Sequence, residues 1–453
     1  MNGDSKVSTR FKITVAVIVT VVSALAIVLV VLFGPDPMPV DWSKVEYIPS
    51  NVTLLEAGAK NNPSKDNVAL VRYKDGAPDN SDWKVLQFTD MHLTQEDDNN
   101  EVTLNHFIAT LKREKPDFVV LTGDIITRPL GRARAVQLAQ IFERMNIYWC
   151  YCLGNHEGDS YPFTLTREEN IRIWAKYPHC LVENDVKKTK DGTEVWGLGN
   201  TVVNLLGADH KVMQSMIFMD SGNRISTDDY NALVKAGVKG IENGCYDFLK
   251  ESQKTWFSEQ VNAVTDNLTN GVKTMLFIHI PLVEQGNVKI LLANESLPEG
   301  WRYAYNTDDH SPIVVGGKIY GYMILKNGWE LVGDTAAYEK CYCSDYNSGM
   351  YDLMRSLRKG VNALFCGHDH VSNSILYETA LAEDDPVYLC YGVSSGLQSY
   401  NMYSLGVSDA DDYHLRGYAV IMVKADSSFD YYNVRYNNVK NKIARILSGV
   451  ACD

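Results

Sequence analysis

Basic residues are scarce in this sequence, which holds 43 Lys and Arg against 56 Asp and Glu and has a net charge of -13. A protein that binds nucleic acid over a broad surface shows a basic excess, so we expect no nucleic-acid partner. The nine cysteines include no Cys-x-x-Cys pair, which argues against a zinc ribbon. Internal repeats and low-complexity tracts are absent too, so neither a repeat protein nor a disordered tract is indicated.

The sequence does contain enough apolar residues for a folded core. Hydrophobic residues make up 45% of the 453-residue chain and charged residues 22%, which describes a folded protein with a sizeable core. This length fits one large domain or two ordinary ones.

A long uncharged apolar run lies near the N-terminus, at residues 13–33. As a helix this run would span about 30 Å, the thickness of the hydrocarbon core of a membrane. Lys6, Arg10 and Lys12 precede it and no positive charge follows closely, so the positive-inside rule places residues 34–453 on the non-cytosolic side. We expect an uncleaved signal-anchor helix; the alternative is a cleaved signal peptide, whose apolar core would normally be shorter.

Further features fit a domain outside the cytosol. Nine cysteines would lie in a compartment where disulfides can form, and Asn-x-Ser/Thr sequons begin at Asn51, Asn267 and Asn294. The sequence thus predicts a single-pass type II membrane glycoprotein. Its folded domain would be extracellular or would lie in the secretory or endolysosomal lumen.

Short apolar runs alternate with amphipathic stretches in the N-terminal half of the folded part. The spacing predicts strands at 85–89, 117–122 and 147–153, separated by helices at 103–115 and 133–145. Apolar strands that alternate with helices indicate an inner sheet covered on both faces. Ligands of such sheets gather beyond the carboxyl ends of the strands, where this chain repeatedly places polar side chains.

Five short stretches that follow apolar runs carry side chains able to bind metal ions. They are Gln-Phe-Thr-Asp90-Met-His92, Gly123-Asp124, Gly154-Asn155-His156-Glu157, Phe-Ile-His279-Ile-Pro and Gly367-His368-Asp369-His370. Half of the ten histidines lie in these stretches. Hydrolysis of a phosphate ester brings an anionic nucleophile to an anionic centre, and two cations about 3.5–4 Å apart make this feasible.

The side chains form a suitable ligand set for two such cations. Asp90 and His92 are two residues apart and can face one side of a turn. Asp124 is the natural bridging carboxylate, and Gly123 permits a close backbone approach. Asn155 offers a neutral carbonyl oxygen. Imidazoles come from His279, His368 and His370.

The series Asp-x-His, Gly-Asp, Gly-Asn-His-Glu, His and Gly-His-x-His resembles the calcineurin-like metallophosphoesterase superfamily over about residues 83–375. The details Gly-Asp-Ile-Ile-Thr-Arg, His-Ile-Pro-Leu-Val-Glu and Phe-Cys-Gly-His-Asp-His resemble its purple-acid-phosphatase-like branch. The resemblance implies an α/β fold, a four-layer α/β/β/α sandwich of two mixed sheets flanked by helices. It also implies a cofactor of two metal ions, drawn from Fe, Mn, Zn or Mg.

The same resemblance implies a role for each residue. One metal would be held by Asp90, His92, Asp124 and His370, and the second by Asp124, Asn155, His279 and His368. His156 would be a catalytic histidine that binds no metal and stabilises the transition state or protonates the leaving group. The predicted catalytic residues are therefore His156 and Asp90, and the predicted substrate-binding residues are Asn155, His156 and Arg128.

Three arginines, Arg128, Arg132 and Arg134, follow the Asp124 stretch and could reach a substrate phosphate. A solvated loop and helix face is the plainer explanation for them. Two other positions depart from the family pattern. Purple acid phosphatases carry a Tyr where this chain has Thr127, so the tyrosinate-to-iron colour should be absent; Glu157 stands where Asp is commoner.

With the resemblance in place, the chain divides into four predicted parts. They are a cytoplasmic tail at 1–12, a transmembrane signal-anchor helix at 13–33, a stalk and edge segment at 34–80, and a metallophosphoesterase domain at 81–453. We expect a membrane-anchored phosphatase that hydrolyses phosphomonoesters by attack of a metal-bound hydroxide. Its partners would be a small phosphate ester or other phosphorylated substrate, and the membrane through residues 13–33.

Three other functions stay open at this point. A phosphodiesterase of the same superfamily, nucleotide-specific or sphingomyelinase-like, would share the ligands, with selectivity set by loops at 285–345 and 395–415. A catalytically retired surface protein could keep the fold, although no ligand is missing. Gly392-Val-Ser-Ser-Gly also matches a serine-hydrolase elbow, but its candidate partners, including His414, crowd into one polar segment.

Overall fold

The computed structural model describes residues 17–20, 22–23, 40–94, 98–127, 131–159, 164–265, 271–304, 312–315, 318–333, 335–397, 399–400 and 415–436. The chain divides into two compact units, Met1–Pro39 and Val40–Asp453. Residues 34–80 were predicted as a stalk and edge segment, and the second compact unit includes this stretch from Val40 onward.

In the first unit, residues 17–20 and 22–23 are helical. The rest of the predicted transmembrane helix at 13–33 lies outside the described residues, as does the predicted tail at 1–12. Among the residues that the structure does describe, no helix combines the length and the apolar character needed to cross a membrane. The anchor and the tail stay predictions.

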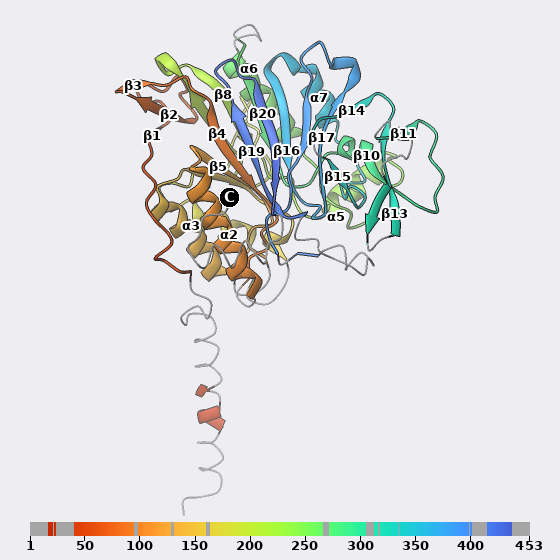
Figure 1. The fold of residues 1–453 in the computed structure, drawn as a ribbon, viewed down its shortest axis with the longest axis horizontal. Coiled ribbons are helices and arrows are strands. Elements are labelled where there is room, and N and C mark those ends of the chain that lie inside the picture. The colour runs from red at the N-terminus through yellow and green to blue at the C-terminus, as the bar shows by residue number, and fades with distance from the viewer. Residues whose placement is uncertain are drawn as a thin grey trace, which may run out of the picture. The chain divides into compact units, whose positions relative to one another are not determined.

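A five-stranded mixed sheet forms one layer of the second unit (Figure 1). In spatial order its strands are β20 (Phe429–Arg435), β19 (Gly417–Val423), β4 (Trp83–Phe88), β5 (Phe118–Thr122) and β6 (Trp149–Cys152). β4, β5 and β6 run parallel, and β19 pairs antiparallel with both β4 and β20. The connecting helices are α2 (Asp98–Glu114) and α3 (Arg132–Met145). This is the strand–helix alternation that the sequence predicted.

An eleven-stranded mixed sheet forms the facing layer. Its main path is β1 (Val52–Leu55), β2 (Val68–Lys74), β7 (Thr201–Leu206), β8 (Val212–Phe218), β9 (Lys273–Phe277), β16 (Val361–Cys366), β18 (Tyr388–Tyr391), β17 (Ser372–Glu378) and β14 (Trp329–Leu331). β3 (Ala77–Pro78) pairs with β2, and β15 (Ala336–Ala337) pairs with β17. β1 and β2 join this sheet by main-chain pairing, which explains why the compact unit extends N-terminal of residue 81.

Aromatic side chains fill the space between the two sheets. Phe218, Phe277 and Phe365 stack in a row across β8, β9 and β16, with ring centroids 4.8 and 4.9 Å apart. Phe118 of β5 meets this row edge-on, 6.5 Å from Phe218. All four rings are fully buried, and stacked or edge-on pairs add attraction beyond their buried area. One continuous apolar core therefore joins the two sheets.

Helices cover the outer face of each sheet. The remaining helices are α4 (Arg167–Trp174), α5 (Thr227–Lys235), α6 (Glu251–Thr265) and α7 (Met350–Ser356), with short 3-10 helices η1 (His156–Gly158), η2 (Ala208–His210), η4 (Val283–Asn287), η5 (Arg358–Gly360) and η6 (Thr379–Leu381). Phe142 of α3 stacks on Trp149 of β6 at 4.7 Å. Trp256 of α6 and Met354 of α7 share a second core with Leu276 of β9. The observed fold is thus the mixed α/β sandwich that the resemblance implied.

A four-stranded antiparallel sheet adds to the large sheet on its β14 side and was not predicted (Figure 1). It consists of β10 (Val288–Leu292), β13 (Lys318–Lys326), β11 (Trp301–Tyr303) and β12 (Pro312–Val315). The sequence indicated only a loop across 285–345, because burial along β13 does not alternate. Gly321 inside β13 fits only as glycine, since an added Cβ would lie 2.5 Å from the carbonyl oxygen of Leu291.

Candidate metal centre

Five strand ends converge at one edge of the two sheets and carry the predicted ligands. β4, β5 and β6 lead into the first three ligand stretches, and β9 and β16 lead into the last two. Parallel pairing within each sheet holds these ends level, so their side chains meet. The structure brings together Asp90, His92, Asp124, Asn155, His279, His368 and His370.

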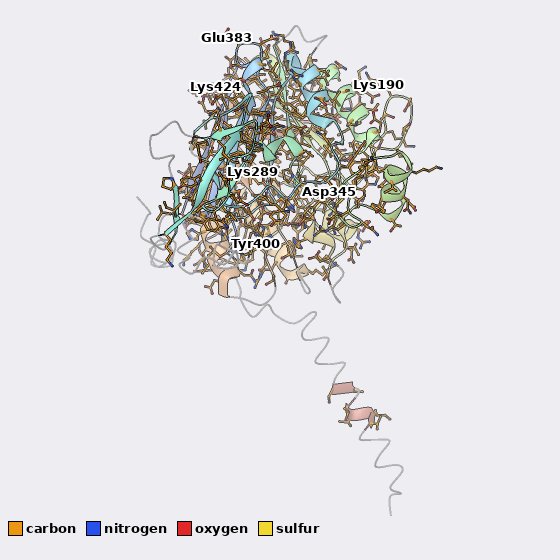
Figure 2. All side chains as sticks on the ribbon, turned by 90° about the vertical axis from the view of Figure 1, so that its right-hand side faces the viewer. Lys190, Lys289, Asp345, Glu383, Tyr400 and Lys424 are labelled. Carbon is orange, nitrogen blue, oxygen red and sulfur yellow. The ribbon has the colours of Figure 1, made fainter. Side chains whose placement is uncertain are left out.

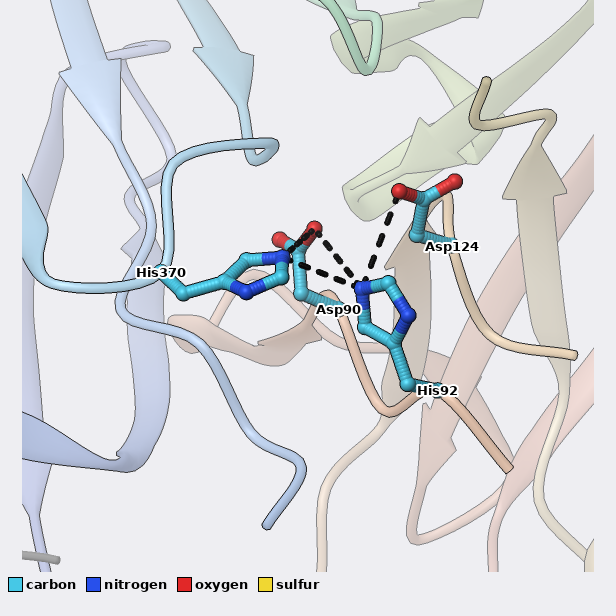
Figure 3. A group of neighbouring side chains, drawn as sticks. All are labelled: Asp90, His92, Asp124 and His370. Carbon is cyan, nitrogen blue, oxygen red and sulfur yellow. Dashed lines mark hydrogen bonds and ion pairs between the residues drawn. The ribbon is translucent and has the colours of Figure 1, made fainter. Parts of the chain in front are cut away.

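Asp90, His92, Asp124 and His370 form the first ligand group (Figure 3). Each offers one donor atom, and these atoms lie within 4.8 Å of one another. His370 Nε2 lies 3.0 Å from His92 Nε2 and 3.4 Å from Asp90 Oδ1. His92 Nε2 lies 3.7 Å from Asp124 Oδ2, and all four side chains are buried.

Asp124, His279 and His368 form the second ligand group, whose donor atoms also lie within 4.8 Å of one another. His279 Nε2 lies 3.2 Å from Asp124 Oδ2, 3.0 Å from Asn155 Oδ1 and 3.2 Å from His368 Nδ1. Its other ring nitrogen, Nδ1, lies 2.7 Å from the carbonyl oxygen of Thr122. A carbonyl only accepts, so Nδ1 carries the hydrogen and Nε2 is available to bind a cation.

The donor atoms of both groups fit bound cations. Asp90 Oδ1 and Asp124 Oδ2 are buried and accept no well-aligned hydrogen bond from any described residue, although the ring nitrogens of His370 and His279 lie 3.4 and 3.2 Å from them. A buried carboxylate oxygen without a partner is destabilising, and more so when it is charged. Cations between the side chains would satisfy these oxygens and would also separate the ring nitrogens of His92 and His370, which face each other at 3.0 Å. The residues present therefore suit two metal ions that share Asp124.

The charges of the side chains at the centre also favour bound cations. Burial lowers the pKa of His92 and of His368 to about 3, so both rings are neutral and keep a lone pair for a metal. Burial also acts to lower the pKa of His279, but the Asp124 carboxylate raises that pKa to about 9. Asp124 thus favours a positive charge beside it, which a metal cation can supply instead of a proton.

The backbone that carries the ligands has an uncommon conformation. Asp90, His92, Asp124 and His368 all have positive φ, between 49° and 96°. Such residues cost about 1–3 kcal/mol each and cluster at functional sites. Gly123, with φ of 85°, permits close packing here, because an added Cβ would lie 2.5 Å from an imidazole nitrogen of the second group. The surrounding fold stabilises a strained but defined ligand geometry.

Glu157 joins the two loops that carry Asp124 and Asn155. Its buried carboxylate accepts backbone hydrogen bonds from Gly154 at 2.6 Å and Asp124 at 3.0 Å. It accepts two more from Ile125 at 2.5 Å and from the next residue at 3.2 Å. The sequence marked Glu157 only as a departure from the family pattern, whereas the structure shows that its carboxylate fixes both loops.

His156 lies beside the ligand groups and not within them. Its backbone N–H donates to Asp124 Oδ1 at 2.7 Å, and its ring centroid lies 5.5 Å from that of His92. Its Nδ1 lies 2.6 Å from Asp159 Oδ2, a partner that the sequence did not predict. Burial opposes protonation, but the hydrogen bond with Asp159 and the charge of Asp124 raise the pKa of His156 to about 9. The half-buried ring can therefore carry a proton at the edge of the site.

Two of the three arginines that could reach a substrate, Arg132 and Arg134, lie among the described residues. Arg128 lies outside the described residues, and Arg132 is exposed at the start of α3. Arg134 is fully buried, and its guanidinium donates to the carbonyl oxygen of Thr94 at 2.9 Å and to Gln137 Oε1 at 2.6 Å. Arg134 thus ties α3 to the loop after β4, which corrects both the substrate role and the solvated-face alternative.

The Gly-Val-Ser-Ser-Gly stretch supports the Asp90 turn and does not form a nucleophile elbow. Ser395 Oγ accepts a hydrogen bond from the Thr89 backbone at 3.2 Å, and Ser394 Oγ donates to the Asp90 carbonyl oxygen at 3.3 Å. Both serines are buried. An added Cβ at Gly396 would lie 2.1 Å from the backbone of the same turn. The loop therefore acts as packing beneath a metal ligand.

Aromatic side chains that the sequence did not single out pack against the ligand imidazoles. The ring of Tyr400 stacks on that of His370, 4.1 Å between centroids, and Tyr246 meets His368 edge-on at 4.5 Å. The Arg224 guanidinium lies 3.9 Å from the centre of the Tyr246 ring. These residues come from segments without metal-ligand motifs, so no sequence signal could have found them.

A mixed α/β sandwich with two Asp/His groups that share one carboxylate defines a dinuclear metallophosphoesterase. A family model for calcineurin-like phosphoesterases matches residues 84–372 of the chain. The chain belongs to this family.

Individual relatives are distant. An uncharacterised Schizosaccharomyces pombe protein, C1020.05, is 27% identical over 195 residues, which cover 37% of this chain and 34% of that protein. The chain thus spans about a third of the length of this curated relative. A dimetal phosphatase from Danio rerio is 10% identical, with 79% of this chain and all of that one covered and a TM-score of 0.39. GAP50, the anchor in the inner membrane complex of Plasmodium, is 11% identical, with 82% and 95% covered and a TM-score of 0.33. Scores this low support no statement about activity.

Proposed function

We propose that this protein is a phosphatase that hydrolyses phosphomonoesters at a centre of two metal ions. The observation that carries the proposal is the pairing of two buried ligand groups through the single carboxylate of Asp124. Two cations that share a carboxylate suit the spacing of about 3.5–4 Å used in phosphate ester hydrolysis. His156 lies next to both groups and can supply a proton.

The ions, when bound, would neutralise the phosphate and acidify a water molecule for attack. Asp90 is prepared as a ligand: its Oδ2 accepts from Thr89 Oγ1 at 2.7 Å and from the His368 backbone at 2.9 Å, which leaves Oδ1 for the metal. This anchoring is the part in catalysis that we assign to Asp90. The remaining ligands would be His92 and His370 on one side, Asn155, His279 and His368 on the other, and Asp124 between them.

Proton transfer to the leaving group falls to His156. Its Nδ1 faces Asp159, so Nε2 is the atom that can donate to a leaving-group oxygen. The amide of Asn155 turns Oδ1 toward His279, and its Nδ2 is left for a phosphate oxygen. Arg128, just beyond the described residues that follow Asp124, would complete the substrate contacts.

The choice of monoester over diester is tested with one leaving group in two substrates. p-Nitrophenyl phosphate and bis(p-nitrophenyl) phosphate are assayed in parallel with Mn, Zn and Fe across pH. We expect hydrolysis that depends on metal, prefers the monoester and disappears on chelation. A clear preference for the diester would make the protein a phosphodiesterase. If neither substrate is hydrolysed in a metal-dependent way, the protein is a catalytically retired member of the fold.

Membership of the purple-acid-phosphatase-like branch is part of the same proposal and is supported by the motif details around Asp124, His279 and His368. Thr127 is buried where members with a coloured iron site carry Tyr. We expect purified, metal-loaded protein to lack a visible tyrosinate-to-iron band. A strong visible band in the absorption spectrum would contradict this expectation.

We further propose that residues 13–33 anchor the protein as a type II membrane glycoprotein, with the phosphoesterase domain outside the cytosol. The uncharged run and the preceding basic residues support this proposal. The sequon residues Asn51 and Asn294 are exposed, while Asn267 lies outside the described residues. Alkaline extraction should leave the full chain in membranes, and glycosidase treatment should shift its mobility. Release by alkali, or cleavage by protease added to the cytosolic side, would contradict the anchor or its orientation.

A further inference from the structure

A cavity of about 1400 Å³ lies at the end of the large sheet away from the metal centre. Its walls come from the carboxyl end of β7, the amino ends of β8 and β9, and α6. β9 runs from this cavity to His279 at its other end. Figure 2 shows the same separation, because Lys190 of the cavity rim lies well apart from Tyr400, which is beside the metal ligands. The cavity is therefore distinct from the metal centre.

Asn204 forms the inner end of the cavity. Its side chain is fully buried, and neither Oδ1 nor Nδ2 has a hydrogen-bond partner among the described residues. Ser215 of β8 is level with Asn204 across the sheet, and Thr274 of β9 is level with Ser215. The hydroxyls of both are likewise buried and without a described partner. Folding leaves such groups unpaired only at a cost, and of the three residues only Asn204 lines the cavity, so its amide is the group for which a bound molecule can supply partners.

Lysines surround the outer end of the cavity. Lys65, Lys188, Lys190 and Lys211 are exposed and make no ion pair with another described residue. Lys187 differs, because it pairs with Glu183. Four available ammonium groups on one rim attract an anion, in a chain whose net charge is otherwise negative.

Acidic residues also lie on this rim, but they offset only part of the positive charge of the lysines. Both carboxylate oxygens of Glu259 accept from the Lys190 backbone N–H, and Asp426 accepts from the Ser428 backbone at 2.9 Å. Asp66 and Asp209 are the remaining acidic groups. A ligand with one compact anionic group, placed toward the lysines, fits this mixture better than a long polyanion.

The wall between the lysines and Asn204 is neither purely polar nor purely apolar. Asn67 and Gln260 form a hydrogen bond of 3.0 Å with each other, and Trp256 is buried beside them. The amides suit the hydroxyls of a sugar ring, whereas Trp256 is 2% exposed and belongs to the apolar core behind the contact surface. The volume far exceeds the share of about 30 Å³ that one water molecule takes, and water would not explain the lysines.

We propose that this cavity binds a small hydroxyl-rich anion, of the chemical class of a sugar phosphate. Its charged group lies between Lys188 and Lys211, and its hydroxyls reach the unpartnered amide of Asn204. The proposal is independent of the metal centre, because none of the predicted metal ligands lines the cavity.

Calorimetric titration of the full chain with glucose 6-sulfate tests the proposal. This probe carries one negative charge, where a sugar phosphate carries about 1.5–2 at pH 7, and it offers no phosphate ester to the metal centre. Glucose and inorganic sulfate serve as its two separate parts. We expect saturable binding of the whole probe, about tenfold tighter than either part. No saturable binding, or binding by sulfate alone that is equally tight, would overturn the proposal.

Variants then place the bound probe. Asn204→Leu keeps the side-chain size and removes the amide, so binding should weaken about tenfold while the melting temperature stays equal or rises. Lys188→Gln combined with Lys211→Gln should weaken binding severalfold, and more strongly at low salt. Lys239→Gln, at an exposed lysine outside the cavity lining, should change nothing. Unchanged binding in the double lysine variant, together with unchanged binding in Asn204→Leu, would place the probe elsewhere and overturn the proposal. If Asn204→Leu does not fold, the double lysine variant alone decides.

Discussion

The two ligand groups of the metal centre share Asp124, yet they are held in different ways. His279 of the second group is fully buried, and its Nδ1 donates to the backbone carbonyl of Thr122 at 2.7 Å. The ring of His92 in the first group hydrogen-bonds, among described residues, only to His370, and its side chain is 11% exposed. A ligand that is fixed in advance loses less conformational freedom when it binds an ion. We therefore expect the second group to hold its ion more tightly, and the first to be more open to substrate.

Asp124→Asn should have the largest effect, because one change removes a charged ligand from both groups at once. Metal content, measured by mass spectrometry, should fall from two ions per chain to less than one, and hydrolysis of a phosphomonoester should fall to background. Asp352→Asn, at an exposed position of α7, should keep both ions and full activity. Retention of two ions after Asp124→Asn would show that the groups do not depend on a shared carboxylate.

His92→Ala and His279→Ala compare the two groups directly. Each variant should lose one ion and most of the activity, because two ions act together on the phosphate. The ion that remains should be held more tightly after His92→Ala, since the second group with its fixed imidazole is intact. Competition with a graded series of chelators measures this order. The opposite order would mean that the hydrogen bond to Thr122 does not organise the second group.

His156→Ala should separate catalysis from metal binding. The ring lies beside both groups, so metal content should stay near two ions per chain while turnover falls by about 10²–10⁴. Metal analysis and steady-state kinetics on the same preparation measure both quantities. Loss of an ion in this variant would place His156 among the ligands instead.

Glu157→Gln should weaken both groups together by a smaller amount. One carboxylate oxygen becomes an amide nitrogen that faces backbone N–H groups, so the loops that carry Asp124 and Asn155 lose a shared acceptor. We expect metal affinity or activity to fall about 10–100-fold. The free energy of unfolding should fall by about 1–3 kcal/mol. Glu168→Gln, at an exposed position of α4, is the matched control, and an equal effect there would remove the special role of Glu157.

The metal ligands of this centre could be predicted from the sequence because each ligand stretch follows an apolar strand. Apolar runs ending at Asp90, Asp124 and Asn155 are enough to place three side chains at one sheet edge. The groups that hold the ligands could not be predicted. Tyr400 and Thr122 act on them through ring stacking and a backbone carbonyl, and neither contact leaves a motif.

The fold, like the metal centre, could be predicted from the sequence only in part. Alternation of apolar and amphipathic stretches predicted the order of β4, α2, β5, α3 and β6, since short and almost fully buried strands alternate there with helices of 17 and 14 residues. β13 escaped prediction because its burial follows no period of two, and its pairing partners are three short strands that precede it in sequence. The four-layer arrangement itself came from the family resemblance, because strand pairing between distant segments cannot be deduced from local pattern.

Asp159→Asn should have the smallest effect and should appear mainly in the pH dependence. Burial lowers the pKa of His156, while the hydrogen bond and charge of Asp159 raise it, and the net result is a pKa of about 9. A histidine that acts as a proton donor loses activity as pH rises through its pKa, so removal of the Asp159 carboxylate should move the alkaline limb of the rate profile to lower pH. Turnover at lower pH should change little, because the ring is still protonated there. Bound cations lower this pKa in both proteins, so the readout is the difference between the two limbs. The same substitution in a His156→Ala background should leave the profile unshifted, and a shift there would mean that another group sets the limb.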